Sequence, residues 1–204
     1  ITLIAVSKTY PAEAIEEAIS LGCEHFGENK VQELMNKVDV VKGNPKWHLI
    51  GHLQTNKVKY VIGHVELIHS VDSLKLAQEI EKQSAKKGVV TSILIEVNVA
   101  KEDSKHGIYV EDVLELVKAI AQLPHVKIEG FMTVAPFTED PEENRPIFKA
   151  LYDLSVDIQK QNIDNISTSI LSMGMSNDYK IAIEEGATLI RIGTALFGAR
   201  DYNR

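Results

Sequence analysis

Strand-like and helix-like segments alternate along the whole chain of 204 residues. Short runs rich in β-branched residues predict strands, and the stretches between them carry apolar residues at the spacing of an amphipathic helix. Val113, Leu116, Val117 and Ile120 illustrate this spacing. The pattern predicts seven helices between eight strands, which are Thr2–Val6, Glu24–Phe26, Lys46–Ile50, Glu66–His69, Thr91–Val99, Val126–Met132, Thr168–Leu171 and Thr188–Ile192.

Strands that are joined by helices run parallel, and a parallel sheet is buried on both faces. Two α/β architectures fit eight such repeats: a closed (β/α)8 barrel and an open doubly wound sheet. An open sheet that binds a dinucleotide needs a glycine-rich turn after its first strand, but here that strand is followed by Ser7, Lys8 and Thr9. We therefore expect residues 1–204 to form a single (β/α)8 TIM-type barrel.

The two ends of the sequence qualify this expectation. No eighth helix is evident after the last predicted strand, and the chain begins without Met inside a strand-like segment. We expect that an N-terminal piece precedes this sequence and that a helix from it completes the outer ring.

Composition narrows the class of protein and its partners. The chain is 44% hydrophobic and 25% charged, which is typical of a globular protein with one sizeable core. Asp and Glu outnumber Lys and Arg by 29 to 22, so the net charge is −7. Duplex nucleic acid and anionic membranes require a basic surface, so we expect neither as a partner. Cys23 is the single cysteine, which excludes an intramolecular disulfide and fits a reducing cytoplasm.

The carboxyl ends of the strands are where a barrel of this type holds its reactive residues. Lys8 stands out because it follows the apolar run Leu3 to Val6, where the chain enters the mouth of the barrel. Partial burial lowers the pKa of a lysine at such a position, and the neutral amine can form an imine with an aldehyde. Taken alone, Lys8 is better explained as a lysine that extends its amine into solvent.

Two loops near the end of the sequence combine glycine with hydroxyl side chains. Residues 171–176 read Leu-Ser-Met-Gly-Met-Ser before a helix expected near Asn177, and residues 192–194 read Ile-Gly-Thr. Free N–H groups at the start of a helix attract anions. The loops follow the last two strands, after which barrels commonly bind phosphate. Together they predict a phosphate site, with a turn and a simple helix cap at Ser176 as the alternative.

An amine at one strand end and a phosphate site across the mouth are what pyridoxal 5′-phosphate requires, because it carries an aldehyde and a phosphate. Arg191, at the end of the last strand, is a third element. A guanidinium only donates hydrogen bonds, so an arginine that faces the pyridine nitrogen needs that nitrogen unprotonated. Such a ring is a weaker electron sink. An ion pair that closes the barrel is the alternative role for Arg191.

His48 and His52 have the spacing of half a zinc site, but no second pair of ligands accompanies them. Their spacing also crosses a strand end instead of following one face of a helix. Structural or ligand-contact roles are therefore favoured over a metal site.

Several longer segments occur in order along nearly the whole chain: AVSKT (5–9), FGEN (26–29), VQE (31–33), WHLIGHLQTNK (47–57), SVDS (70–73), SKHG (104–107), GFMT (130–133), LSMGMSNDY (171–179) and RIGTALFG (191–198). Together they resemble the pyridoxal phosphate homeostasis protein family. The fold of that family is similar to the barrel domain of alanine racemase, which agrees with the barrel expected from the strand pattern.

The resemblance implies a role for individual residues. Lys8 would carry pyridoxal phosphate as a Schiff base, Asn29 would lie beside the cofactor ring, and Arg191 would face the pyridine nitrogen. The implied phosphate contacts are Ser172 or Ser176 together with Gly193 and Thr194, and the implied neighbours of the cofactor are Met175 and His52.

The resemblance also bears on catalysis. The sequence shows no counterpart of the second domain with which alanine racemase supplies a catalytic tyrosine, and Lys8 is the one plausible base where racemisation needs two. We expect a non-catalytic protein that holds pyridoxal phosphate, buffers its concentration and delivers it to apoenzymes, as a monomer or weak homodimer. The alternatives are a low-activity amino-acid racemase that uses Lys8 with Tyr179 or Tyr202, and a phosphate-binding barrel without cofactor.

Overall fold

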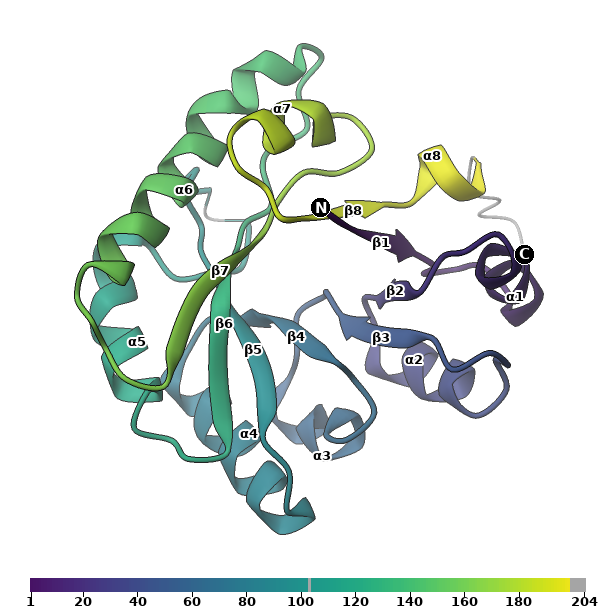
Figure 1. The fold of residues 1–204 in the computed structure, drawn as a ribbon, viewed down its shortest axis with the longest axis horizontal. Coiled ribbons are helices and arrows are strands. Elements are labelled where there is room, and N and C mark those ends of the chain that lie inside the picture. The colour runs from purple at the N-terminus through teal and green to yellow at the C-terminus, as the bar shows by residue number, and fades with distance from the viewer. Residues whose placement is uncertain (103, 199–204) are drawn as a thin grey trace.

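Eight parallel strands close into a barrel in sequential order, from β1 through β8 and back to β1 (Figure 1). The computed structural model describes residues 1–102 and 104–198. The predicted barrel is confirmed, and each predicted strand overlaps one that is present. The strands are β1 (Thr2–Val6), β2 (His25–Glu28), β3 (Lys46–Leu49), β4 (Leu67–Val71), β5 (Thr91–Glu96), β6 (Val126–Met132), β7 (Ile166–Ser172) and β8 (Leu189–Ile192).

Helices connect the strands and cover the outside of the barrel, with α5 and α6 forming a layer beyond β6 and β7 in Figure 1. They are α1 (Ala12–Ser20), α2 (Val31–Val38), α3 (Val58–Val61), α4 (Leu74–Lys87), α5 (Val113–Ile120), α6 (Arg145–Gln159), α7 (Tyr179–Glu184) and α8 (Thr194–Phe197), with single 3₁₀ turns at Thr55–Lys57, Val110–Asp112 and Pro141–Asn144. The helix α8 corrects the expectation that none follows the last strand. Its four residues are too few to show a helical repeat.

Apolar side chains form two separate clusters. The larger one lies between the sheet and the helices and includes Phe26, Trp47 and Phe148. The smaller one lies inside the barrel, where a single inward-facing layer consists of Ile4, Leu67, Leu94, Met132 and Leu189. Buried polar side chains, among them His48, His69, Glu96 and Arg191, also stand on the strands, and their burial is costly without hydrogen-bond or charge partners.

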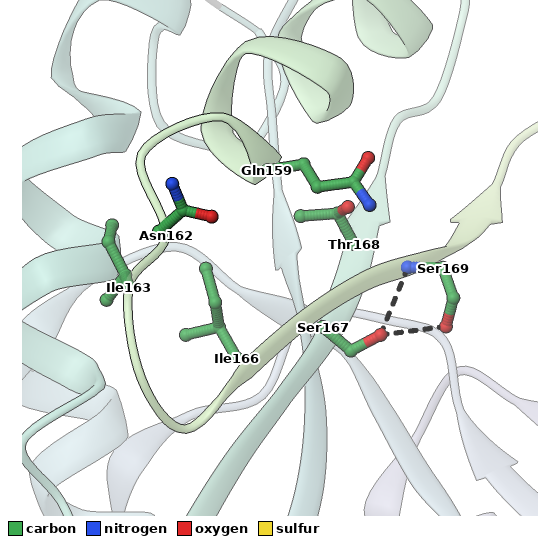
Figure 2. Close-up of a pocket in the computed structure, with 7 residues that line it drawn as sticks. All are labelled: Gln159, Asn162, Ile163, Ile166, Ser167, Thr168 and Ser169. Carbon is green, nitrogen blue, oxygen red and sulfur yellow. Dashed lines mark hydrogen bonds between the residues drawn. The ribbon is translucent and has the colours of Figure 1, made fainter.

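The amino end of the barrel wall has a cavity of its own, beside the start of β7. Figure 2 shows this cavity, of about 410 Å³, with Ser167 donating to the hydroxyl of Ser169 at 2.9 Å. Its lining contains amide, hydroxyl and aliphatic groups but no ionisable side chain, and it is far along the strand from the carboxyl ends. It therefore lacks the amine and the cation that the sequence analysis requires of the cofactor site.

Among the described residues, no helix combines the length and the apolar composition needed to span a lipid bilayer.

Candidate functional site

A cavity of about 370 Å³ opens at the carboxyl ends of the strands. Seven of the nine residues expected at the cofactor site line it: Lys8, Asn29, Met175, Ser176, Arg191, Gly193 and Thr194. Five further residues complete the lining, namely Val6, Ile50, Val134, Phe137 and Asn177. Residues that are far apart in the sequence are thus gathered at the end of the barrel where reactive groups are expected.

Lys8 follows β1 on a loop whose two flanking residues are both held by carboxylates. The Ser7 hydroxyl donates to Glu28 Oε1 at 2.6 Å, and the Thr9 N–H donates to Glu33 Oε1. Lys37 lies between the two carboxylates, with Nζ at 2.7 Å from each of these oxygens. We call Ser7, Glu28, Glu33 and Lys37 the Lys37 network.

Thr9 shows that this loop is under constraint. Its φ of 72° lies in the left-handed region, which a β-branched residue rarely adopts. Such a conformation costs about 1–3 kcal/mol and persists only where the surroundings impose it. The hydrogen bond to Glu33 is one such influence, so the path of the chain at Lys8 is fixed on both sides.

Glu28, like Ser7, is fully buried in the Lys37 network. Burial raises its pKa above the ordinary value, although the ion pair with Lys37 and the hydrogen bond from Ser7 oppose this change. Its Oε2 has no hydrogen-bond partner among the described residues. Lys37 is therefore the main compensation for a carboxyl group that is otherwise poorly solvated.

Asn29 is placed by a close approach between the loops after β2 and β3. A Cβ atom on Gly51 would lie 2.4 Å from the backbone oxygen of Asn29, which is closer than real Cβ contacts allow. Only glycine lets these two loops come together in this way. Gly51 thereby fixes the position of Asn29 at the rim of the cavity.

The loop after β7 is shaped by Asp178. Its Oδ1 accepts the Met175 N–H at 2.7 Å, and its Oδ2 accepts the Asn144 side-chain amide at 2.9 Å. The sharp turn at Gly174, with φ of 90°, brings its Cα so close to α7 that a Cβ would lie 2.6 Å from that of Ala182. Met175 and Ser176 are presented to the cavity from this fixed turn.

Ser176 also connects the two loops that were expected to bind phosphate. Its hydroxyl accepts the Gly193 N–H at 3.4 Å. The helices that follow, α7 and α8, have six and four residues. In helices this short, few peptide dipoles add up. Individual N–H and hydroxyl groups therefore contribute more of the attraction for an anion than was expected from the sequence.

Arg191 is buried, with 4% of its surface exposed, and is one of the residues that line the cavity. Its Nη1 donates to the Ser172 hydroxyl at 2.6 Å and its Nη2 donates to the Thr133 carbonyl at 2.9 Å. Burial lowers its pKa to about 10, against the opposing charges of Glu96 and Asp178. The guanidinium therefore remains a cation near neutral pH, and these two bonds use two of its five N–H donors.

Glu96, at the end of β5, is one of the two carboxyl groups whose charges act on Arg191. Burial and the charge of Asp72 together raise the pKa of Glu96 to about 7, against the opposing effect of Arg191. Its Oε2 has no hydrogen-bond partner in the described part of the chain. Near neutral pH the protonated and the ionised form of this carboxyl group are therefore both populated.

Ser172 does not line the cavity. It is fully buried, and its hydroxyl contacts Arg191 and the ring of His69. The structure thus places Ser172 behind the arginine, whereas Ser176 is the serine of this loop that faces the cavity.

His52 lies in a neighbouring depression beside Asp72, with Nδ1 at 4.0 Å from the carboxylate. Its ring stacks on that of His106, with centroids 3.9 Å apart and planes within 13° of parallel. Ligand atoms of these three residues lie within 4.8 Å of one another. Because imidazole lone pairs lie in the ring plane, two stacked parallel rings cannot both point at one metal ion, so this arrangement is not an assembled metal site.

Tyr179 and Tyr202 were the candidate second bases. Tyr179 begins α7 and packs against the larger apolar cluster, and it is not among the residues that line the cavity. Tyr202 lies outside the described residues. Lys8 is therefore the one candidate base of the sequence analysis that the structure places at the cavity.

Comparison with known proteins identifies the family. A sequence profile described as "Alanine racemase, N-terminal domain" matches residues 1–201. The pyridoxal phosphate homeostasis protein of Aquifex aeolicus is 48% identical over 201 residues, which cover 98% of this chain and 87% of that protein. This chain belongs to the pyridoxal phosphate homeostasis protein family.

Solved structures agree with this assignment. PipY of Synechococcus elongatus, in a structure with PLP bound, has a TM-score of 0.89 and 37% identity, covering 97% of this chain and 92% of PipY. Alanine racemase from Corynebacterium glutamicum has a TM-score of 0.74 at 15% identity, covering 98% of this chain and 57% of the enzyme. The second likeness shows that this chain shares the fold of the racemase barrel, as expected from the sequence.

Proposed function

We propose that this protein binds pyridoxal 5′-phosphate in the cavity at the carboxyl end of the barrel, with Lys8 as the residue that forms the Schiff base. It then takes part in pyridoxal phosphate homeostasis in the cytoplasm, by buffering the cofactor and delivering it, without robust catalysis. The observation that carries the proposal is the presence of Lys8, Ser176 and Arg191 in the lining of one cavity.

The donor set of this cavity fits the cofactor. Pyridoxal phosphate presents an aldehyde, a phosphate and a ring nitrogen, and the cavity offers an amine from Lys8, hydroxyl and N–H groups around Ser176, and a buried cation at Arg191. Its volume of about 370 Å³ lies within the usual range for small-molecule sites. The family name and the PipY structure with PLP bound support the same choice.

Each lining residue has an assigned task in this proposal. Lys8 would bind the aldehyde of the cofactor through its amine. Asn29 would lie beside the ring, and Arg191 would donate to the pyridine nitrogen, which requires that nitrogen to be unprotonated. Ser176, Gly193 and Thr194 would hold the phosphate, and Met175 would be a neighbour of the cofactor. When bound, pyridoxal phosphate supplies an electron sink, which an unprotonated nitrogen weakens.

The carrier role follows from what the cavity offers for proton transfer. Racemisation requires bases on both faces of the ring, and among the candidates within the described residues only Lys8 lines the cavity. Apoenzymes that depend on pyridoxal phosphate are the partners that such a carrier would serve. The oligomeric state, a monomer or a weak homodimer, remains a prediction.

One experiment tests the site and the bond together. Purified protein is incubated with pyridoxal phosphate, its absorbance is recorded, borohydride is added, and peptide masses are mapped. We expect an imine band that disappears on reduction and a pyridoxyl adduct on Lys8. Lys8→Ala should lose both, whereas Lys30→Ala, at an exposed lysine of the next loop, should keep both. An adduct on another lysine, or none, contradicts the proposal.

A second experiment separates the carrier from a catalyst. The loaded protein is incubated with L-alanine or L-serine in deuterated water, and exchange of the α-proton is followed. In parallel, cofactor transfer to an apoenzyme is measured. Transfer without exchange supports the carrier, and exchange that Lys8→Ala abolishes would establish the racemase alternative.

A further inference from the structure

A continuous hydrogen-bond chain of three imidazoles crosses the interior of the barrel and ends at Arg191. His25 Nδ1 lies 2.9 Å from His48 Nε2, and His48 Nδ1 lies 3.0 Å from His69 Nε2. His69 Nδ1 lies 3.0 Å from the Ser172 hydroxyl, which in turn lies 2.6 Å from Arg191 Nη1. We call these five residues the imidazole chain. Of its three histidines, only His48 was noted in the sequence, as part of a weak metal motif.

The two ends of the imidazole chain lie at different cavities. Arg191 lines the cavity of about 370 Å³ at the carboxyl end. His25 and His48 line a separate cavity of about 310 Å³ at the amino end, together with Thr2, Glu66, Leu67, Ser92, Glu129, Ile170 and Leu189. Leu67 and Leu189, in the lining of the amino-end cavity, also belong to the smaller apolar cluster.

The two central rings carry one proton each near neutral pH. His69 is fully buried and His48 nearly so. Burial, followed by the charges of His25 and Lys46, lowers the pKa of His48 to about 3, and burial also places the pKa of His69 well below its usual value. A neutral imidazole has one donor and one acceptor nitrogen, so each ring can donate in only one direction.

Arg191 determines that direction. A guanidinium only donates, so the Ser172 oxygen accepts from Nη1. The Ser172 hydroxyl is fully buried, and His69 Nδ1 is its remaining partner among the described contacts, so its proton must go there. His69 then carries its proton on Nε2 and donates to His48 Nδ1. His48 in turn donates from Nε2 to His25 Nδ1.

We propose that His69, His48 and His25 are positioning residues for Arg191, forming a one-directional chain that fixes the guanidinium at the cofactor cavity and links it to the cavity at the amino end of the barrel. All three rings carry the proton on Nε2. The geometry of the chain is independent of the cofactor, and its effect on pyridoxal phosphate rests on the function proposed above.

The direction in which the imidazole chain donates its hydrogen bonds is measured in protein without cofactor. Long-range ¹H–¹⁵N spectra of protein labelled with ¹⁵N-histidine distinguish a proton on Nε2 from one on Nδ1. We expect His48 and His69 to be Nε2–H tautomers near neutral pH. A proton on Nδ1 of either ring, or exchange between the two forms, overturns the proposal.

Ser172→Ala tests whether Arg191 sets the direction. The variant removes the only hydroxyl between the guanidinium and His69 and leaves both larger side chains in place. We expect the His69 ring to lose its single tautomer, and Arg191 to bind the cofactor ring less firmly. An unchanged tautomer in a folded Ser172→Ala protein shows that the arginine does not govern the chain.

The effect on the cofactor is tested by breaking and restoring the chain at His48. His48→Leu interrupts it, whereas in His48→Gln the side-chain amide can accept from His69 and donate to His25. We expect His48→Leu to weaken pyridoxal phosphate binding about tenfold and shift its absorbance, and His48→Gln to restore both towards wild type. Ser92→Ala, in the same amino-end cavity but outside the chain, is the matched control.

The outcomes distinguish this proposal from the function on which it partly rests. If His48→Leu and His48→Gln bind the cofactor equally while both fold, the positioning role is wrong. If wild type binds no pyridoxal phosphate, the proposed function is wrong, and the tautomer measurements still decide whether the directional chain exists.

Discussion

Two buried polar systems share this barrel, and they avoid the cost of burial in opposite ways. The Lys37 network uses full charges, with a lysine between two carboxylates. The imidazole chain uses neutral rings, and its single charge is at the end, on Arg191. Both support a residue that lines the cavity at the carboxyl ends of the strands, because the first flanks Lys8 and the second holds Arg191.

The difference follows from the position of each system. The Lys37 network lies near the rim, where Glu33 is a quarter exposed and water can solvate part of the charge. The imidazole chain crosses the centre, where His69 is fully buried and an ionised group would be far more costly. Charge is used where water is near, and neutral hydrogen bonds are used where it is not. The two systems should therefore respond differently to substitution and to pH.

The largest effect is expected from removing the cation of the Lys37 network. Lys37→Met leaves Glu28 buried without its ion-pair partner, which should lower the free energy of unfolding by about 3–5 kcal/mol. Urea denaturation measures this change. Lys46→Met, which breaks an exposed pair with Glu24, is the control and should cost less than about 1 kcal/mol. Equal losses of stability in the two variants would show that the buried ion pair contributes no more to stability than the exposed one.

The next effect concerns Glu96, which faces the charged end of the imidazole chain. Its folded pKa of about 7 is above the ordinary 4.5, so its contribution to stability is complete below pH 4.5 and is lost as the pH rises through 7. Glu96→Gln removes this dependence. Relative to the variant, wild type should lose about 3 kcal/mol between these limits. The free energy of unfolding of both proteins is measured at several pH values. A difference between wild type and Glu96→Gln that stays the same at every pH would refute the raised pKa.

The imidazole chain should show the reverse dependence. The folded pKa of His48, about 3, is below the ordinary 6.5, so stability from its neutral form is present above pH 6.5 and falls as the pH decreases towards 3. Between pH 7 and pH 5, wild type should lose about 2 kcal/mol relative to His48→Gln. Chemical denaturation of both proteins at the two pH values measures this, and a loss of equal size in the variant would contradict it.

The smallest effect is expected at Thr9, where the Lys37 network holds a strained residue. Thr9→Gly relieves the left-handed φ of 72° and keeps the N–H that donates to Glu33, so we expect a gain of up to about 1 kcal/mol in the free energy of unfolding. Thr138→Gly, at a residue without positive φ, should instead lose stability. A loss of stability in Thr9→Gly would mean that the loop is not strained.

Much of the fold was predictable because it depends on patterns that repeat locally. Strand runs and helical spacing fixed the order of the elements, although β7 begins at Ile166, two residues before its predicted start. The helix after β8 was harder to predict, because α8 is a single turn. The rule that barrel sites lie at the carboxyl ends of strands then selected Lys8 and Arg191, and both line the cavity.

Other parts of the site depend on the path of loops and on which way a side chain faces. Ser172 ends β7 facing the interior, so it contacts Arg191, while Ser176 reaches the cavity because Gly174 and Asp178 turn the loop. His52 lies beyond β3, and its ring turns towards His106. Phe137, which is 86% exposed, has no sequence signal that places it at the cavity.

The imidazole chain could have been suspected from the sequence, because its histidines recur on successive strands. His25, His48 and His69 occur on three successive strands, and His48 and His69 each follow an apolar residue within their strand. A polar residue within a strand that is buried on both faces needs a partner inside the barrel. Which atoms pair depends on the stagger between neighbouring strands, and that information is absent from any single strand.

The brevity of α7 and α8 also has a consequence for how an anion leaves. A long helix attracts charge over several ångströms, whereas two short turns act mainly on atoms that touch them. A phosphate there would be released one contact at a time. Single substitutions at Ser176 and Thr194 should then change the dissociation rate in separable steps.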